Sequence, residues 1–205
     1  DVSEQMQVRL DKRARIIADG GQAYPVDLLR DHTLVQVRQK YTDDTGELTL
    51  APGEETTDEV TVGGRVVFVR NTGKLCFASL QDGFTETSNG ERLQIMLSKA
   101  EVGDESLAAW KSDVDLGDHV WVRGRVVVSR RGELSIMAAE WRMASKALRP
   151  LPTLHKELSE ETRVRRRYAD LVVREESRQM VRTRAVITRA VRRALDERGF
   201  LEIET

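Results

Sequence analysis

Apolar and polar residues alternate with a period of two through the middle of the chain, which is typical of strands with one buried face. The pattern predicts five strands, at 60–70, 74–81, 92–97, 119–129 and 133–143. Turn residues at 71–73, 83–90 and 130–132 predict a meander of three strands and a hairpin of two. Between them, Asp104 is expected to cap a short helix over 105–111. Three strands, a helix and two strands form the order of a five-stranded OB barrel.

Side chains alternate across a strand, so each strand of the barrel should have an apolar inner face. The expected inner residues are Cys76, Ala78, Leu80, Leu93, Ile95, Leu97, Val120, Val122, Val126 and Val128. This leaves Phe77 on the outer face, where a ring among small neighbours is a platform for an unstacked base. Arg70, Gln94 and Glu133 fall on neighbouring strands and would offer hydrogen-bond donors and an acceptor. These four residues predict a surface that binds single-stranded RNA.

The segments before the barrel are predicted to be helical and then irregular. Ser3 can cap a first helix, in which apolar residues recur at helical spacing up to Ile17 and which Gly20 and Gly21 end. A short helical turn is expected over 33–40. The acidic, turn-rich stretch 42–59 is interpreted as a flexible, solvated loop.

After the barrel, Pro150 and Pro152 stiffen an extended linker. Helices are predicted over 157–174 and from a cap at Ser177 to residue 198, with a strand beginning at Phe200. The predicted fold is therefore mainly β with flanking helices, in the α+β class. Its expected parts are a helical extension with the acidic loop, the OB domain, the linker, and the truncated start of another domain, at 1–58, 59–145, 146–156 and 157–205.

Composition narrows the kinds of site that the chain can hold. Its 205 residues carry a net charge of -1, so any nucleic-acid site must arise from a local arrangement of charge. Cys76 is the single cysteine, which excludes an internal disulfide and argues against a cysteine-based zinc site. No metal site or membrane segment is predicted. The chain starts at Asp1 and stops within a predicted strand, and we interpret it as a piece of a longer protein.

Four segments are specific enough to suggest a family: GGRVVFVRNTGKLCFASLQD at 63–82, LGDHVWVRGRV at 116–126, RRGELSI at 130–136 and KALRPLP at 146–152. Together with RVRRRYADL and a long helix ending in RGFLEIET, they make the chain resemble lysyl-tRNA synthetases of bacterial and actinobacterial type, which are class II enzymes. The resemblance covers nearly all of the chain. Residues 178–205 resemble the first class II motif of that family, a helix and strand at the dimer interface.

The resemblance implies that the barrel binds the anticodon loop of tRNA(Lys) through Arg70, Phe77, Gln94 and Glu133. It also implies that the full-length parent is a cytoplasmic, homodimeric lysine–tRNA ligase that uses ATP and Mg²⁺. The other class II motifs would follow Thr205, so no catalytic residue, cofactor or metal site is expected in this chain. We expect the chain alone to be inactive, to bind tRNA weakly and to dimerise weakly or not at all.

Three of the four proposed anticodon-binding residues also have a structural interpretation. The loop 83–92 can cover Phe77, Glu133 can serve the hairpin turn, and Arg70 can pair with a surface carboxylate. Trp121 is interpreted as a cover on the strand surface. Several basic residues are candidate phosphate contacts, although a solvated helix face or a packing role is the favoured interpretation. These residues are Lys12, Arg13, Arg15, Arg165 and Arg166.

Two other functions remain open. One is a generic OB module that binds single-stranded nucleic acid, or a related synthetase such as that for aspartate, because the scaffold alone does not fix the function. The other is the synthetase portion of a bifunctional protein that supplies lysyl-tRNA for lysinylation of phosphatidylglycerol. Apolar spans upstream of Asp1 would identify that protein.

Overall fold

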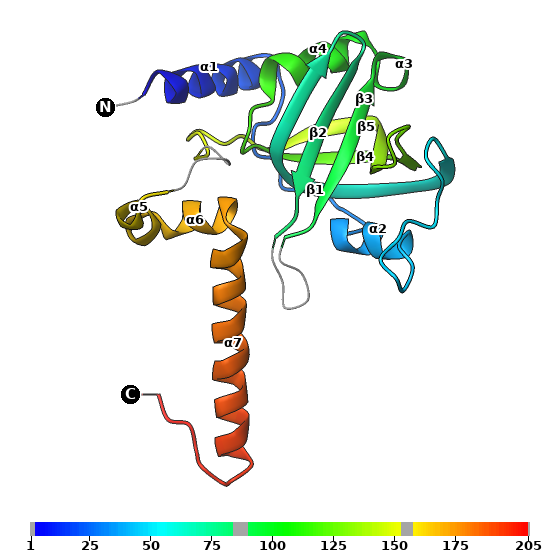
Figure 1. Cartoon of the computed structure of the whole chain (residues 1–205). Helices are drawn as coiled ribbons and strands as arrows, with labels where there is room; N and C mark the ends of the chain where they lie inside the picture. The colour runs from blue at the N-terminus through cyan, green and yellow to red at the C-terminus, as the bar shows by residue number, and fades with distance from the viewer. Residues whose placement is uncertain (1–2, 84–89, 153–157, 205) are drawn as a thin grey trace. The chain divides into compact units, whose positions relative to one another are not determined.

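The computed structural model describes residues 3–83, 90–152 and 158–204, which form two compact units. The first contains a five-stranded barrel with helices α1 to α4, and the second contains helices α5 to α7 (Figure 1). The predicted OB barrel with flanking helices is confirmed, and each strand lies within a few residues of its predicted bounds. The strands are β1 Glu55–Thr72, β2 Leu75–Gln81, β3 Arg92–Ser98, β4 His119–Val128 and β5 Leu134–Ser145.

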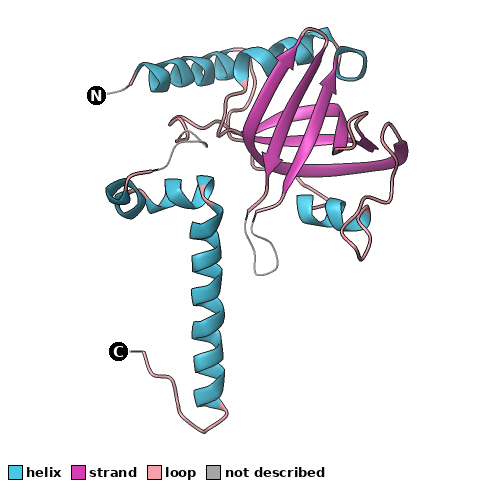
Figure 2. Ribbon diagram, in the orientation of Figure 1, coloured by secondary structure: helices cyan, strands magenta, loops and turns pink. Residues whose placement is uncertain are grey.

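The five strands close into a ring in the order β1-β2-β3-β5-β4. The meander and the hairpin are both antiparallel, as predicted, and β1 also pairs antiparallel with β4. A short parallel pairing between β3 and β5, at residues 94–96 and 135–137, completes the ring. Figure 2 shows the strands wrapped around one another, with α1 and α4 at one end of the barrel. Closure leaves no unpaired edge strand along most of the ring.

The interior of the barrel contains all ten aliphatic and small residues that the alternation places there. Helix α4 (Asp104–Asp113) adds Leu107 and Trp110, and the Trp110 ring meets the Trp141 ring edge-on with centroids 5.1 Å apart. Helix α4 follows the short helix α3 (Lys99–Val102), which was not predicted. The N-cap of α4 is Gly103 and not the predicted Asp104, which lies in the first turn of the helix. No side-chain hydrogen bond caps α4.

Helix α1 (Glu4–Ala18) begins at the predicted cap, where the Ser3 hydroxyl accepts a hydrogen bond from Met6 N. One charged side chain of this helix is buried: Arg9 is 8% exposed, whereas Ile17 is half exposed. The Arg9 guanidinium donates to the carbonyls of Leu116 and Ala147 at 2.9 and 3.0 Å. The apolar spacing predicted the helix correctly, and polar partners from distant segments hold its Arg9 side chain.

Helix α2 (Leu34–Lys40) has the predicted position, and Thr33 and Gln36 form a capping box at its start. The interpretation of 42–59 as a flexible loop was wrong in part. Residues 55–59 belong to β1, and Asp43 accepts backbone hydrogen bonds from Thr45 and Glu47 in a tight turn. The segment folds because its few apolar residues, Leu48 and Leu50, pack against the barrel core.

The first turn of the linker after β5 is fixed by a buried ammonium group. Lys146 is fully buried, and its Nζ donates to Asp118 Oδ2 at 2.7 Å, to Asp115 Oδ2 at 2.6 Å and to the Asp113 carbonyl at 2.7 Å. Ala147 N donates to the other oxygen of Asp118 at 2.7 Å. We call Asp113, Asp115, Asp118 and Lys146 the linker clasp. The clasp fixes the direction in which the chain leaves the barrel.

The second unit contains α5 (Glu160–Arg165), α6 (Arg167–Val173) and α7 (Glu175–Asp196). The buried Asp170 carboxylate joins α6 to α7, because it accepts from the Ser177 hydroxyl and from the guanidinium groups of Arg167 and Arg174. Helix α7 has a half-exposed row of apolar side chains. They are Met180, Val186, Ile187, Val191 and Leu195.

Three local predictions for the second unit were wrong. The single helix over 157–174 is divided at Arg166, whose ψ of 51° is not helical, and its first residue lies outside the described residues. Ser177 lies inside α7 instead of capping it, because its hydroxyl is used by Asp170. Residues 200–204 form no strand, since a strand needs a neighbour to pair with and the described part of this unit is helical.

Candidate nucleic-acid interface

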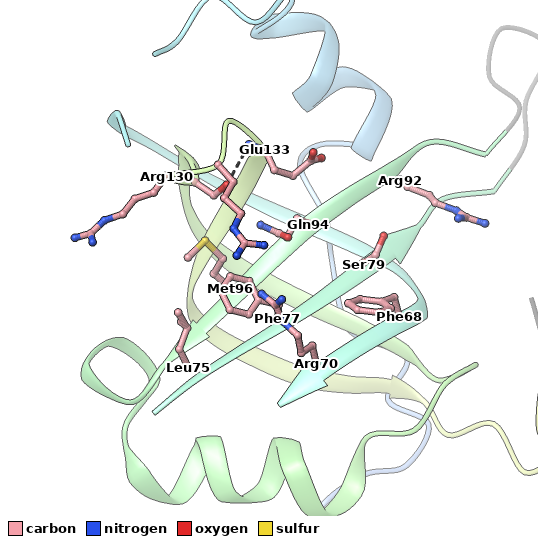
Figure 3. A pocket seen from close by; sticks show the side chains of 12 residues that line it. Phe68, Arg70, Leu75, Phe77, Ser79, Arg92, Gln94, Met96, Arg130 and Glu133 are labelled. Atoms are coloured by element: carbon pink, nitrogen blue, oxygen red, sulfur yellow. Dashed lines mark hydrogen bonds between the residues drawn. The ribbon is translucent and has the colours of Figure 1, made fainter. Parts of the chain in front are cut away.

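The outer faces of β1, β2 and β3, together with the turn that precedes β5, line a groove of about 850 Å³. All four predicted site residues lie in it, and their side chains project from different strands toward the same space (Figure 3). We call this space the outer-face groove. Its lining residues are Phe68, Arg70, Leu75, Phe77, Ser79, Arg92, Gln94, Met96, Ser129, Arg130, Arg131 and Glu133.

Strand register explains why these side chains meet. Arg70 on β1 lies opposite Phe77 on β2, which lies opposite Met96 on β3. Two residues along, an adjacent row contains Phe68, Ser79, Gln94 and Ser135. Side chains two residues apart on a strand share a face, so both rows point outward from the barrel.

A bulge in β1 directs Phe68 and Arg70 to this face. Val66 and Val67 are both buried, and the register shifts between Val66 and Phe68. Continued alternation from Val66 would have turned Phe68 and Arg70 inward, whereas the extra residue turns them outward. The sequence reasoning missed Phe68 for this reason. Two adjacent valines followed by an outward ring are the available signal of the bulge.

The Phe77 ring is half-buried and has a cation above it. The Arg70 guanidinium carbon lies 4.6 Å from the ring centroid, within the range of a cation–π contact. The contact holds the guanidinium N–H donors beside the stacking surface. The alternative in which 83–92 covers Phe77 involves residues 84–89, which lie outside the described residues.

A hydrogen bond to β5 fixes the orientation of the Gln94 side chain. Its Nε2 donates to the Ser135 hydroxyl at 2.8 Å, and this hydroxyl in turn donates to the Glu133 carbonyl at 2.9 Å. Ser135 is fully buried, so the chain of hydrogen bonds is shielded from water. Gln94 therefore presents its remaining N–H and its carbonyl oxygen to the groove in a fixed orientation.

Glu133 serves both the turn and the groove. Its N–H donates to the Ser129 hydroxyl at 3.0 Å, and its carbonyl accepts from Ser129 N at 2.9 Å. Gly132 takes the positive φ of 84° that this turn requires. The Glu133 carboxylate is about half exposed and lies 3.8 Å from Arg38 Nη2, which donates to the Arg92 carbonyl as well. The backbone of Glu133 thus serves the turn, while its carboxylate can accept a hydrogen bond in the groove.

The groove also gathers positive charge that composition alone hides. Arg92, Arg130 and Arg131 are exposed and line it together with Arg70, whereas Glu133 is the single carboxylate among the lining residues. Four guanidinium groups against one carboxylate give a cationic surface in a chain of net charge -1. The three additional arginines were not predicted, because their positions read as turn or strand-end residues.

Of the candidate phosphate contacts, the three in the first unit do not line the groove. Lys12 pairs with Asp115 at 2.7 Å, Arg15 pairs with Asp113, and Arg13 lies over the Tyr24 ring. In the second unit, Arg165 pairs with Glu161, and Arg166 is the residue at the junction of α5 and α6.

Trp121 has a role on the strand surface. Its Nε1 donates to the Leu29 carbonyl at 2.8 Å, and the Arg142 guanidinium lies over its ring.

Among residues 3–83, 90–152 and 158–204, no three metal-binding side chains come together. In the same ranges, no helix has the length and hydropathy needed to cross a bilayer.

Comparison with known proteins identifies the family. Residues 60–144 match the family model described as an OB-fold nucleic acid binding domain, and residues 159–205 match that of class II tRNA synthetases of the D, K and N type. The chain belongs to the class II aminoacyl-tRNA synthetases. Both units of the chain thus match parts of one kind of protein, and the resemblance inferred from the motifs is confirmed.

The chain is similar to proteins named lysine–tRNA ligases. Over all 205 residues it is 60% identical to a lysine–tRNA ligase of Kineococcus radiotolerans and 56% identical to one of Mycolicibacterium gilvum. A lysylphosphatidylglycerol biosynthesis bifunctional protein of Rhodococcus jostii is 38% identical over 98% of the chain and 16% of its own length. The chain spans 39% of the length of the first two relatives.

Proposed function

We propose that this chain recognises the anticodon of tRNA(Lys) as part of a lysine–tRNA ligase. The observation that carries the proposal is the gathering of Arg70, Phe77, Gln94 and Glu133 in one groove. A ring to stack on, donors and an acceptor are the groups that a protein needs to hold an unstacked base and read its edge.

The donor and acceptor pattern favours uracil over cytosine. Uracil has two carbonyl acceptors and one N3–H donor, and the lysine anticodon is rich in uridine. Arg70 and the free N–H of Gln94 can donate to the carbonyls, and the Glu133 carboxylate can accept from N3–H. Cytosine has an unprotonated N3 and an amino group in place of one carbonyl, so it would leave Glu133 and one donor without partners. An unpaired buried polar group costs about 1–3 kcal/mol, which sets the scale of discrimination.

The parent enzyme would join lysine to tRNA with ATP and Mg²⁺ through a lysyl-adenylate. Because this chain spans only 39% of the length of the lysine–tRNA ligases that it matches, we expect it to bind tRNA but not to aminoacylate it by itself. The half-exposed apolar row of α7 is the surface expected to form the homodimer in the whole enzyme. The proposed domains are 1–58, 59–145, 146–156 and 157–205, and the proposed compartment is the cytoplasm.

A stand-alone ligase is favoured over the bifunctional lipid-modifying protein by the higher identity of the former's relatives, 60% against 38%. The generic OB module is disfavoured because the groove holds fixed edge-reading groups beside its ring. A generic binder relies on stacking and charge instead.

A competition assay tests the proposal. A short RNA hairpin with three uridines at the anticodon positions is bound to the chain, and unlabelled oligocytidine or oligoadenosine of equal length is added. We expect the homopolymers to compete poorly at every salt concentration. Equal competition, with a common salt dependence, would assign the chain to the generic class.

A further inference from the structure

Of the two aromatic residues that line the groove, Phe68 is the one that the proposed base reading does not use. Its ring is 53% exposed, although a phenylalanine is usually buried. It lies on the outer face beyond Ser79, on the side away from Gln94 (Figure 3). A single exposed apolar residue needs no explanation. This one, however, continues a surface that already contains an aromatic platform.

The spacing of the two rings suits two bases. Phe68 lies opposite Ser79, and Phe77 is two residues from Ser79 on the same strand and the same face. The rings are thus offset by one row, which is about 6.7 Å along the strand from a rise of about 3.3–3.4 Å per residue. Stacked nucleotides rise by about 3.4 Å, so one continuous stack cannot cover both rings. Two consecutive bases that are splayed apart can lie on one ring each.

The surroundings of Phe68 lack the amide and the carboxylate that the proposed base reading uses. Its cross-strand neighbour is Ser79, whose short side chain leaves the space above the sheet open. Arg92, the first residue of β3, lies two positions before Gln94, is exposed and can meet a phosphate. Glu133 and Gln94 lie on the other side of the groove (Figure 3). A ring with a nearby cation holds any base by its face.

We propose that Phe68 is a second stacking platform, which holds the base next to the one over Phe77 without reading its edge. The inference rests on the proposed anticodon function and deepens it. It assigns the two rings different roles: Phe77 is the platform of the base that is read, and Phe68 keeps the neighbouring base out of its stack. A splayed neighbour exposes the edge of the read base to Arg70, Gln94 and Glu133.

The test uses the chain and hairpins in which each of the three anticodon nucleotides in turn is abasic. Loss of one stacked base weakens binding by about fivefold or more. We expect Phe68→Ala to weaken binding of the intact hairpin by a similar factor. The loss should vanish on one of the two hairpins that are abasic beside the central position, and persist on the hairpin that is abasic at the centre. Phe68→Trp should retain affinity, and Leu29→Ala, which removes an 84% exposed side chain outside the groove, should have no effect.

The outcomes separate this inference from the function on which it rests. If Phe77→Ala weakens binding whereas Phe68→Ala does not, the second platform is wrong and the anticodon function stands. If Phe68→Ala gives the same loss on all three abasic hairpins, Phe68 supports the fold of the groove and the inference is overturned. If neither substitution changes affinity, both proposals fail. Phe68→Leu distinguishes a ring from mere bulk, because only stacking predicts that leucine fails to restore binding.

Discussion

Removal of the Lys146 ammonium group should destabilise the barrel unit far more than removal of a surface lysine. In Lys146→Met, Asp118 would remain fully buried without its cation, and Asp115 would lose one of its two ammonium partners. Burial tends to raise the pKa of Asp115, but hydrogen bonds from Lys12 and Lys146 outweigh it and lower that pKa. These hydrogen bonds thus favour the ionised form of the Asp115 carboxylate.

The expected cost is about 3 kcal/mol, at the lower end of the 3–5 kcal/mol that breaking a buried ion pair costs. The lower end applies because Asp118 would keep two backbone donors, Asp115 N at 2.8 Å and Ala147 N at 2.7 Å. The matched control is Lys99→Met. Lys99 is 47% exposed and pairs with the exposed Asp104, so its removal should cost less than about 1 kcal/mol.

Urea unfolding followed by tryptophan fluorescence reports on the first unit, because this unit contains all three tryptophans of the chain. They are Trp110, Trp121 and Trp141. With a slope of about 2 kcal/mol per molar urea, the midpoint of Lys146→Met should fall by about 1.5 M. Adding Asp118→Asn should recover part of the loss, because no buried carboxylate would then lack its cation. A midpoint shift no larger than that of Lys99→Met would refute the reasoning.

Of four further predictions, three concern the groove and one concerns the half-buried His119. Phe77→Ala should weaken binding of the uridine hairpin by about 1–3 kcal/mol in fluorescence anisotropy, whereas Phe77→Tyr should not. Ser135→Ala removes the hydroxyl that orients Gln94. The preference for the uridine hairpin over one with a central cytidine should therefore fall by about fivefold, equivalent to about 1 kcal/mol, while affinity for the cytidine hairpin stays unchanged. An undiminished preference would contradict this role. Arg131→Ala should reduce the slope of log K against log salt by about 0.7 if its guanidinium meets a phosphate, and a titration at several salt concentrations measures that slope. Burial, with the nearby Arg65 cation, lowers the pKa of His119 to about 4, so between about pH 6.5 and 4 the unfolded chain binds the extra proton and stability is lost as the pH falls. Between pH 7 and pH 5 the free energy of unfolding should fall by about 1–2 kcal/mol, and this fall should be absent in His119→Gln. Urea unfolding of both proteins at pH 7 and pH 5 measures the difference. Equal pH dependence in the two proteins would contradict the prediction.

The barrel was predictable because alternation fixes which side of a strand is buried. Cys76, Ala78 and Leu80 on β2 and Leu93, Ile95 and Leu97 on β3 follow a strict period of two, and all six are buried. The same alternation placed Phe77 and Gln94 outside, where the groove lies. A one-residue error in register would have exchanged the faces, so apolar burial alone determined the position of these site residues.

What the sequence did not reveal depends on contacts between distant segments. Phe68 reaches the groove through a bulge, which local alternation does not encode. Arg9 and Lys146 are buried by partners that lie up to 138 residues away, and a polar residue in a helix or linker is ordinarily interpreted as exposed. A strand at 200–204 needs a partner strand, which the described part of its unit does not supply.

The most direct test of base reading compares the uridine hairpin with one whose central uridine is replaced by cytidine. The dissociation constant of each is measured with the unmodified chain under identical salt. The arrangement of Arg70, Gln94 and Glu133 predicts that cytidine weakens binding by about 1–3 kcal/mol, which corresponds to roughly five- to 150-fold. Equal affinity for the two hairpins would contradict anticodon reading by this groove.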